Sequence, residues 1–183
     1  LQMNRTIASD LYRHFGLKGT KGLLKGLTYP GFRYTYFLRK VSQHQKKSLA
    51  KFFYKSLLRR CRFKYGFEIN PEAIIGEGFY LTSHCSPVII GPIKMGKNCN
   101  VSHCVTIGRG IAGARKGRPV LGDDVWIGPG SVIVGKITIG NDVLIAPNTF
   151  VNFDVPDHSI VIGSPGKVIA KENPTEDYLH YKV

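Results

Sequence analysis

An aliphatic residue returns at nearly every sixth position between Ile69 and Val155. The repeated positions are Ile69, Ile75, Leu81, Ile89, Met95, Val101, Ile107, Leu121, Ile127, Ile133, Ile139, Ile145 and Val151. An α-helix repeats its apolar positions every 3.6 residues and a strand every 2, so neither element alone explains a period of six. A six-residue unit cannot bury its own apolar side and must stack on copies of itself. The period therefore predicts a mainly β fold built of stacked coils.

A smaller or β-branched residue lies four positions after most of these aliphatic residues. These positions are Ala73, Cys85, Ile93, Cys99, Val105, Val125, Ser131, Ile137, Val143, Thr149 and Val155. We expect triangular coils in which the aliphatic side chains point inward and the smaller residues lie at tight corners, where Gly and Asn supply the required backbone angles. No pair of the four cysteines has CxxC spacing. We therefore expect the cysteines to be buried as small hydrophobic residues.

The chain divides into three segments around this repeat. Residues 1–66 are basic and carry apolar residues at helical spacing, so they predict a helical segment that Gly66 ends. Residues 67–158 form the predicted β-helix, from which the glycine-rich stretch 109–118 should project as a loop. Residues 159–183 read as a strand, a turn and a tail, and we expect the last dozen residues to be loosely held.

The net charge of +14 is concentrated in the helical segment. Residues 1–64 hold 16 lysines and arginines against the single acid Asp10, whereas the remaining residues hold 10 against 11 acids. Such asymmetry indicates an anionic partner, either a nucleic acid, a membrane surface or a charged ligand. No signal-peptide core and no apolar run of about 18 residues is present, so the expected compartment is the cytoplasm, or the periphery of the inner membrane.

Two motifs beside the hexads support a family resemblance. The stretch from His84 to Gly91 (HCSPVIIG) and the stretch from Val105 to Gly108 (VTIG) resemble the serine acetyltransferase branch of the hexapeptide acyltransferases. The resemblance covers most of the chain and includes the segment 163–167 near its end. It implies a left-handed parallel β-helix, a homotrimer, and acetyl-CoA bound in the cleft between neighbouring chains. The expected activity is transfer of an acetyl group to a hydroxyl.

The resemblance assigns the catalytic base to His84. A neutral imidazole with a pKa near 6.5 can remove a hydroxyl proton at cellular pH. A carboxylate beside the imidazole would fix its tautomer and stabilise the imidazolium. Glu68 lies where serine acetyltransferases carry an acid in this role, about one coil away from His84, and we expect these two side chains to act together.

The resemblance also suggests residues for the co-substrate and the acceptor. Cations of the loop 109–118 and of the tail can bind the phosphates of acetyl-CoA, and small residues along the coils can border its pantetheine arm. The expected co-substrate residues are Gly108, Arg109, Arg115, Lys116, Pro129, Ala146, Lys167 and Lys171. Ser83 and Arg118 lie where the serine-specific enzymes contact the acceptor.

The acceptor is the least constrained part of the interpretation. The serine enzymes have an acid before the catalytic histidine where this chain has Ser83, and Gly117 and Arg118 stand where those enzymes have an arginine and a histidine. We therefore expect a saccharide acceptor, such as a capsule, O-antigen or exopolysaccharide precursor, which the basic segment would hold near an anionic membrane. L-serine is the alternative. A nucleic-acid-binding module is a remote alternative, because no nucleic-acid motif accompanies the charge, and we expect no such partner.

A second histidine, His103, follows His84 by 19 residues, almost one coil. Two histidines raise the question of a metal site. A catalytic zinc usually has three protein ligands, and the repeat offers no third histidine. We therefore expect no metal.

Overall fold

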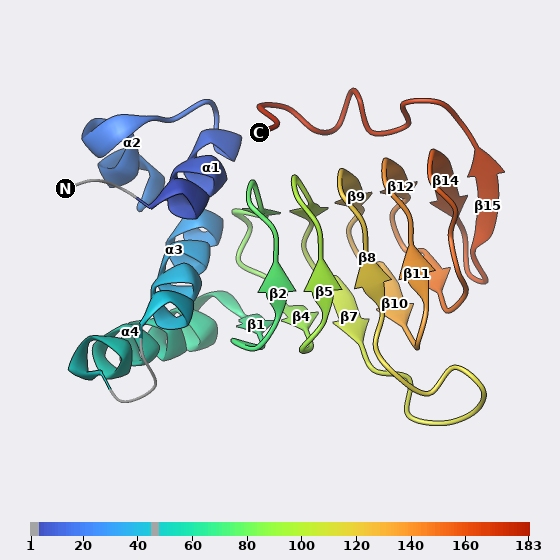
Figure 1. Ribbon diagram of the computed structural model, residues 1–183, viewed down its shortest axis with the longest axis horizontal. Coiled ribbons are helices and arrows are strands. Elements are labelled where there is room, and N and C mark those ends of the chain that lie inside the picture. The colour runs from blue at the N-terminus through green and yellow to red at the C-terminus, as the bar shows by residue number, and fades with distance from the viewer. Residues whose placement is uncertain (1–3, 45–47) are drawn as a thin grey trace.

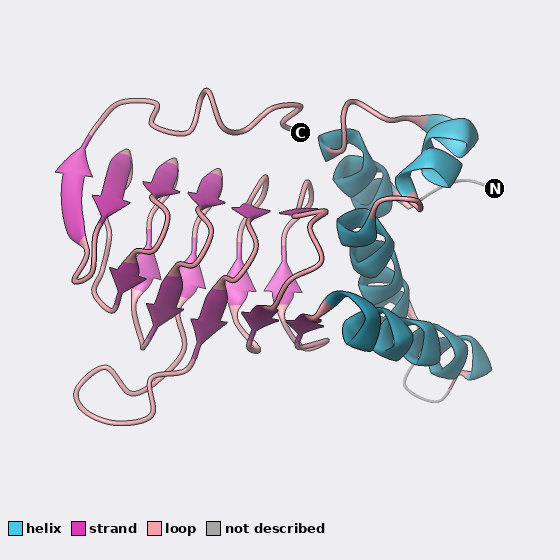
Figure 2. Ribbon diagram, turned by 180° about the vertical axis from the view of Figure 1, so that it is seen from behind, coloured by secondary structure: helices cyan, strands magenta, loops and turns pink. Residues whose placement is uncertain are grey.

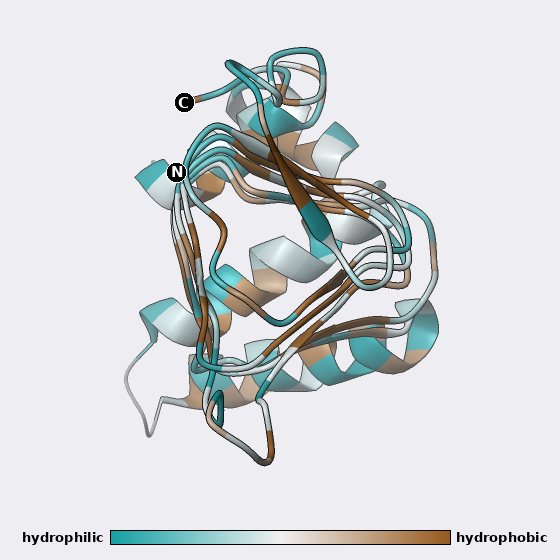
Figure 3. Ribbon diagram, turned by 90° about the vertical axis from the view of Figure 1, so that its right-hand side faces the viewer, coloured by the Kyte–Doolittle hydropathy of each residue, from teal (hydrophilic) through white to brown (hydrophobic). Residues whose placement is uncertain are grey.

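The computed structural model describes residues 4–44 and 48–183, in which short parallel strands wind into a β-helix with helices at one end (Figure 1). Seen along the axis of the coils, the β-helix is triangular (Figure 3). Its three faces are named A, B and C below. Face A holds β1 (Phe67–Ile69), β4 (Val88–Ile90), β7 (Thr106–Gly108), β10 (Val132–Val134) and β13 (Phe150–Val151) in that order.

Face B holds β2 (Ile74–Ile75), β5 (Lys94–Met95), β8 (Val120–Leu121) and β11 (Thr138–Ile139). Face C holds β3 (Tyr80–Leu81), β6 (Asn100–Val101), β9 (Val125–Ile127), β12 (Val143–Ile145) and β14 (Ser159–Ile162). A last strand, β15 (Lys167–Ala170), pairs antiparallel with β14 and ends face C. The predicted mainly β fold with a helical N-terminal segment is confirmed.

The inward positions of successive coils stack in columns. On face A the column consists of Ile69, Ile90, Ile107, Ile133 and Val151, which are paired in register and almost fully buried. Burying a side chain of this size stabilises the folded state by roughly 1.5–3 kcal/mol. The repeated aliphatic positions therefore correspond closely to the buried core of the β-helix.

The corners between faces require unusual backbone angles. Gly78, Asn98, Asp124, Asp142 and His158 occupy successive turns between faces B and C, and all have φ between 51° and 73°. Glycine adopts such angles freely, and Asn and Asp adopt them more readily than most other residues. These residues therefore turn the chain at the same corner of each coil.

The expected position of Ile89 in the core is wrong. Its side chain is 47% exposed, whereas its neighbour Ile90 is buried and stacks on Ile69. The inward position after Leu81 is Ile90 and not Ile89, so the bend after β3 is one residue longer than expected. The next side of the coil, which ends at Met95, is one residue shorter. Because side chains alternate between the two faces of a strand, a shift by one residue exchanges inside and outside.

Two cysteines also differ from expectation. Cys61 and Cys99 are buried, but Cys85 and Cys104 are exposed. The longer bend carries Cys85 out of the corner position, and Val88 is buried there instead. Cys104 lies in a turn with φ 58°, on the outside of the coil.

Four helices precede the strands in the described residues: α1 (Arg5–Arg13), α2 (Gly19–Gly26), α3 (Pro30–Gln43) and α4 (Leu49–Tyr65). Pro30 opens α3, a position that suits proline because the first helical N–H has no intrahelical partner. At Gly31 an added Cβ would lie 2.1 Å from the carbonyl oxygen of Leu81, so only glycine allows α3 to approach the first coil this closely. None of the helices in the described ranges has the length and apolar composition needed to cross a bilayer.

The helices satisfy backbone groups at the open end of the β-helix. Arg39 of α3 donates to the carbonyl oxygens of Ile75 and Gly76 at 2.6 Å each, and to the carboxylate of Asp10 at 2.8 Å. Asp10, which is 1% exposed, accepts from the backbone N–H of Phe79 at 2.9 Å. Unpaired backbone groups at a sheet edge would otherwise cost free energy or pair with another chain.

The C-terminal tail is not loosely held, contrary to expectation. After β15 it returns along face C to the helices (Figure 2). Thr175 donates to Asp142 at 2.5 Å, the ring of Tyr178 packs on Trp126 at 4.7 Å between centroids, and the backbone N–H of Val183 donates to Asn98 at 2.9 Å. Side-chain contacts at regular intervals therefore fix the tail.

Replacing Arg39 with Met should lower the free energy of unfolding by about 3–5 kcal/mol, because it leaves the Asp10 carboxylate buried without its cation. Burial raises the pKa of Asp10, and Arg39 opposes that shift. The double variant Asp10→Leu/Arg39→Met should lose less, since it leaves no buried charge unpaired. Denaturant titration of the three proteins measures this, and equal losses in both variants would contradict the ion-pair account.

The folded protein should lose stability in acid through His14. This ring is fully buried against Tyr80, its nitrogens have no hydrogen-bond partner among the described residues, and burial lowers its pKa from 6.5 to about 4. The unfolded chain takes up this proton at higher pH than the native chain does. About 3 kcal/mol is therefore lost as the pH falls from about 6.5 through about 4. In the His14→Phe variant, the free energy of unfolding should depend less steeply on pH in this range. An unchanged pH dependence would assign the effect to another titratable group.

Candidate active site

The longer bend after β3 places His84 at the edge where face C meets face A. His103 lies at the same edge of the next coil, and the centroids of the two rings are 5.7 Å apart. Stacked coils rise by about 4.8 Å, so residues one coil apart in sequence become neighbours. The structure thus brings together two imidazoles that are 19 positions apart in the chain.

Both imidazoles open into a pocket of about 420 Å³ on the outer side of face C. Tyr80, Asn100 and Trp126 form its floor, because they are paired in register and point outward from β3, β6 and β9. Phe15 and Tyr29 form a wall contributed by the helical segment. The pocket therefore combines titratable groups with aromatic surfaces from two parts of the chain.

Thr82 orients the ring of His84. Its Oγ1 lies 3.1 Å from Nδ1 of His84 and also accepts the backbone N–H of His84 at 3.3 Å. A hydroxyl oxygen has two acceptor sites, so it can accept from both nitrogens. In the tautomer whose Nδ1–H donates to Thr82, Nε2 keeps its lone pair and can take up a proton.

Glu68 does not contact His84, contrary to expectation. It lies on face A, where its carboxylate forms an ion pair with Arg62 at 2.7 Å, and both side chains are about half exposed. It borders a different hollow, between α4 and the first coils. No hydrogen bond or ion pair joins it to His84 in the described part of the chain, where the hydroxyl of Thr82 takes the expected place of a carboxylate.

Of the residues expected to bind the co-substrate, two continue the edge that carries the histidines. Pro129 lies in the turn from β9 to β10, where its neighbour Gly130 donates to the carbonyl oxygen of His103 at 3.0 Å. Ala146 follows β12 at the next turn of the same edge. Lys167 begins β15 beyond the last coil. These positions form a line that runs away from His84 along the outside of the β-helix.

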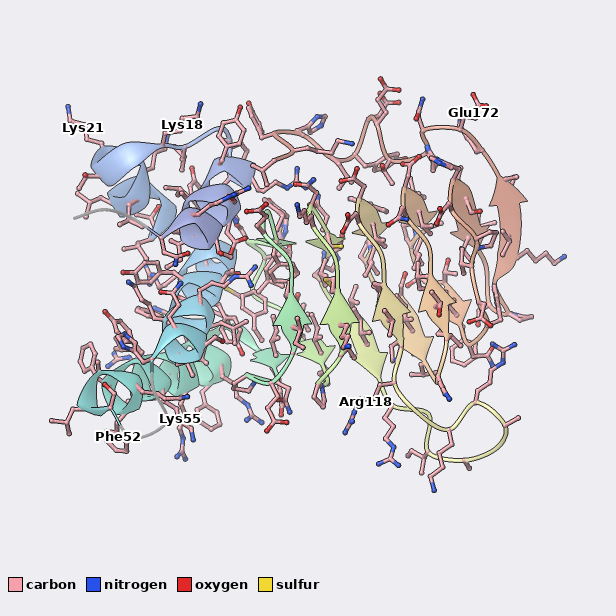
Figure 4. All side chains as sticks on the ribbon, viewed as in Figure 1. Lys18, Lys21, Phe52, Lys55, Arg118 and Glu172 are labelled. Carbon is pink, nitrogen blue, oxygen red and sulfur yellow. The ribbon has the colours of Figure 1, made fainter. Side chains whose placement is uncertain are left out.

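Other expected co-substrate residues lie at a different edge. Gly108 ends β7 on face A, and the loop 109–118 leaves the β-helix there, at the edge between faces A and B (Figure 1). The backbone pairing of Gly110 with Gly117 closes the loop, and Arg115 contacts Asp154 at 3.6 Å. Arg118 extends outward at its base (Figure 4). Face A separates this loop from His84 within one chain.

The remaining expected residues lie in three places, and Lys171 belongs to neither of these two edges. Ser83 lines the pocket beside His84, and its hydroxyl is buried without a partner among the described residues. Lys171 lies at the start of the tail, where its backbone N–H donates to His158. Lys116 and Arg109 belong to the projecting loop.

Sequence reasoning missed several pocket residues. The expectation for His103 concerns only a metal, although its spacing from His84 predicts that the two rings meet. Among the described residues there is no cluster of three or more side chains that could hold a metal. The pocket positions of Tyr29 and Trp126 carry no sequence signal, because they depend on how the helices and the coils pack together.

The chain is similar to known proteins along most of its length. Residues 118–152 match the family described as "Bacterial transferase hexapeptide (six repeats)". The serine acetyltransferase of Helicobacter pylori is 34% identical over 147 residues, which cover 80% of this chain and 85% of the relative. That of Bacillus pumilus is 36% identical over 148 residues, but this chain spans only 66% of its length.

Solved structures agree with the sequence comparisons. The serine acetyltransferase of Neisseria gonorrhoeae superposes with a TM-score of 0.74 at 27% identity, covering 94% of this chain and 67% of that one. The soybean serine acetyltransferase in complex with serine also gives 0.74 at 27% identity, covering 90% and 68%.

These comparisons contradict the expected saccharide acceptor and a role in polysaccharide biosynthesis. The relatives and solved structures named above are serine acetyltransferases, which agrees with the alternative acceptor, L-serine. The departures at Ser83, Gly117 and Arg118 were therefore a poor guide to the acceptor, since the proteins that match over most of the chain point elsewhere.

Replacing Thr82 with Val should shift the tautomer of His84 away from the Nδ1–H form. A neutral hydrogen bond contributes about 1 kcal/mol, which corresponds to a roughly fivefold change in the tautomer ratio. Nitrogen NMR of labelled imidazoles measures this ratio. Thr82→Ser keeps the hydroxyl and serves as the control. An unchanged ratio in the Val variant would show that Thr82 does not orient the ring.

Proposed function

The chain belongs to the serine acetyltransferase branch of the hexapeptide-repeat acyltransferases, and from this premise we propose that it transfers the acetyl group of acetyl-CoA to the hydroxyl of L-serine. The observation that carries the proposal is the placement of His84: an imidazole with one nitrogen oriented by Thr82 faces a pocket large enough for a small acceptor.

In the proposed reaction, Nε2 of His84 removes the proton of the serine hydroxyl as its oxygen attacks the thioester carbonyl carbon. The carbon–oxygen bond forms, and the carbonyl oxygen becomes an oxyanion. When the intermediate collapses, the carbon–sulfur bond breaks and the imidazolium gives its proton to the departing thiolate. The products are O-acetylserine and CoA, and His84 returns to its neutral form.

We assign the second imidazole to the oxyanion. His103 lies one coil beyond His84 in the direction in which Pro129 and Ala146 continue. A co-substrate lying along this edge would present its thioester between the two rings. A hydrogen bond from His103 to the carbonyl oxygen would strengthen as negative charge develops there, which is the property that lowers the barrier.

The position of the loop 109–118 supports a site completed by another copy of the chain. Arg109, Arg115, Lys116 and Arg118 can bind the phosphates of acetyl-CoA, but face A lies between them and His84 in the same chain. In a closed trimer, the loop of one copy can reach the histidine edge of the next. We therefore propose a homotrimer with the co-substrate between neighbouring copies.

The proposed role of His84 is tested by His84→Ala, which should lower kcat by about 10²–10⁴ with L-serine as acceptor, because a positioned base contributes this factor. CoA release, followed with a thiol reagent, measures the rate, and equilibrium binding of CoA should change little. His180→Ala removes an exposed histidine outside the pocket and serves as the control.

Two outcomes would contradict parts of the proposal separately. Full activity of His84→Ala with L-serine would remove His84 as the base. Failure of L-serine to accelerate CoA release, while another hydroxyl compound does so, would overturn the acceptor and leave the acetyl transfer intact.

A further inference from the structure

Helix α4 has a second apolar surface, which points away from the protein. Its inner side packs on the core through Leu58, Cys61 and Tyr65. On the opposite side, Leu49, Phe52, Phe53 and Phe63 are 90%, 77%, 59% and 73% exposed. These four residues are called the outer face of α4.

The spacing of the outer face is helical. Phe52 and Phe53 follow Leu49 by three and four residues, and Phe63 lies about four turns after Leu49. The four side chains therefore lie in one stripe along the helix, in which Ser56 and Arg60 fall between Phe53 and Phe63. Monomeric proteins rarely leave such a stripe of large apolar residues in water without a partner.

Cations flank this stripe. The helix contains Lys51, Lys55, Arg59, Arg60, Arg62 and Lys64 and no acidic residue. Among these six, only Arg62 forms an ion pair within the described residues, with Glu68. Figure 4 shows Phe52 and Lys55 projecting from α4 at the helical end of the molecule. The surface thus combines large apolar side chains with cations beside them and, at Arg60, among them.

This charge distribution argues against a second copy of the chain as the partner, with its own helical segment packed on the outer face of α4. Residues 1–64 contain one acid, Asp10, which is buried and bound by Arg39. Two helical segments placed face to face would therefore bring cations together with no carboxylate between them. The complementary partner is an anionic surface with an apolar layer beneath it.

We propose that the outer face of α4 docks on an anionic lipid bilayer, with its phenylalanines at the boundary of the acyl chains and its cations on the headgroups. Helices that lie in the plane of a membrane interface combine an apolar side of Phe and Leu with flanking Lys and Arg. A hollow of about 490 Å³ between α4 and the first coils offers room for a headgroup beside the stripe. Lys55 and Arg59 border it, together with Arg62 and Glu68, which form an ion pair with each other. This inference is independent of the acceptor, because α4 does not line the pocket of His84.

The test is cosedimentation of the full chain with vesicles of phosphatidylcholine alone or with about 30 mol % phosphatidylglycerol. The wild-type protein should partition at least about tenfold more strongly onto the anionic vesicles, and raising the salt from about 0.1 M to about 1 M should release it. The variants Phe52→Ser/Phe63→Ser and Lys55→Gln/Arg59→Gln should each reduce the partition coefficient at least about tenfold.

Matched controls remove similar groups elsewhere. Ile74→Ser/Ile162→Ser removes exposed apolar side chains from the β-helix, and Lys94→Gln/Lys136→Gln removes two exposed lysines. The partition coefficients of these variants on anionic vesicles should stay within about twofold of the wild-type value. Both the insertion of apolar side chains and the attraction of cations to the headgroups act through α4. Acetyl transfer without vesicles should be unchanged in all four variants, which separates this test from that of the proposed function.

Three results would overturn the proposal. Equal partition onto both kinds of vesicle would remove the anionic requirement. Binding to a DNA duplex without binding to vesicles would assign the cations to nucleic acid. A smaller oligomer in Phe52→Ser/Phe63→Ser, with no vesicle binding by the wild type, would assign the stripe to a protein interface.

Discussion

A β-helix must end, and at its first coil the ladder of backbone hydrogen bonds has no further strand to pair with. Here side chains of the helices take that role: Tyr34 accepts from the backbone N–H of Ile69, Asp10 accepts from that of Phe79, and Arg39 donates to two carbonyl oxygens. Arg13 donates to a fifth backbone group, the carbonyl oxygen of Gly78. The ion pair of Arg39 with Asp10 holds two helices to the coil at once. The orientation of the whole helical segment follows from it.

That orientation decides what the pocket contains. Once α1 and α3 are docked on the first coil, the segments beside them carry Phe15 and Tyr29 to the outer side of face C, opposite Trp126. The tail reaches the same region from the other end of the molecule, where Tyr178 packs on Trp126 and Arg13 donates to the carbonyl oxygen of His180. The pocket around His84 is therefore lined by the helical segment and the first coils, and the tail supports it indirectly by packing on Trp126.

The edges of the β-helix separate the parts of the proposed reaction. One edge carries the imidazoles and the line of small residues beyond them, and another carries the cationic loop. Because each coil repeats the same corners, residues placed at one corner of successive coils become a continuous row. An extended co-substrate fits such a row, and a loop from a second copy can complete it. The outer face of α4 lies apart from both edges.

The sequence alone determined the β-helix, since a six-residue period in aliphatic residues has few other structural solutions. It also singled out His84 as the candidate base, through the motif around it, and predicted the projecting loop 109–118, through its glycines. It misplaced Ile89 and Cys85, because the length of a bend is decided by how the chain packs locally, and a change of one residue reverses inside and outside. Only the tertiary structure showed that Glu68 pairs with Arg62, that Thr82 orients His84 and that the tail is fixed. The tail contact and the ion pair of Glu68 join different elements, whose relative positions depend on the packing of helices and coils. Thr82 and His84 are two residues apart, and they meet because of the shape of one bend, which the residue types do not reveal.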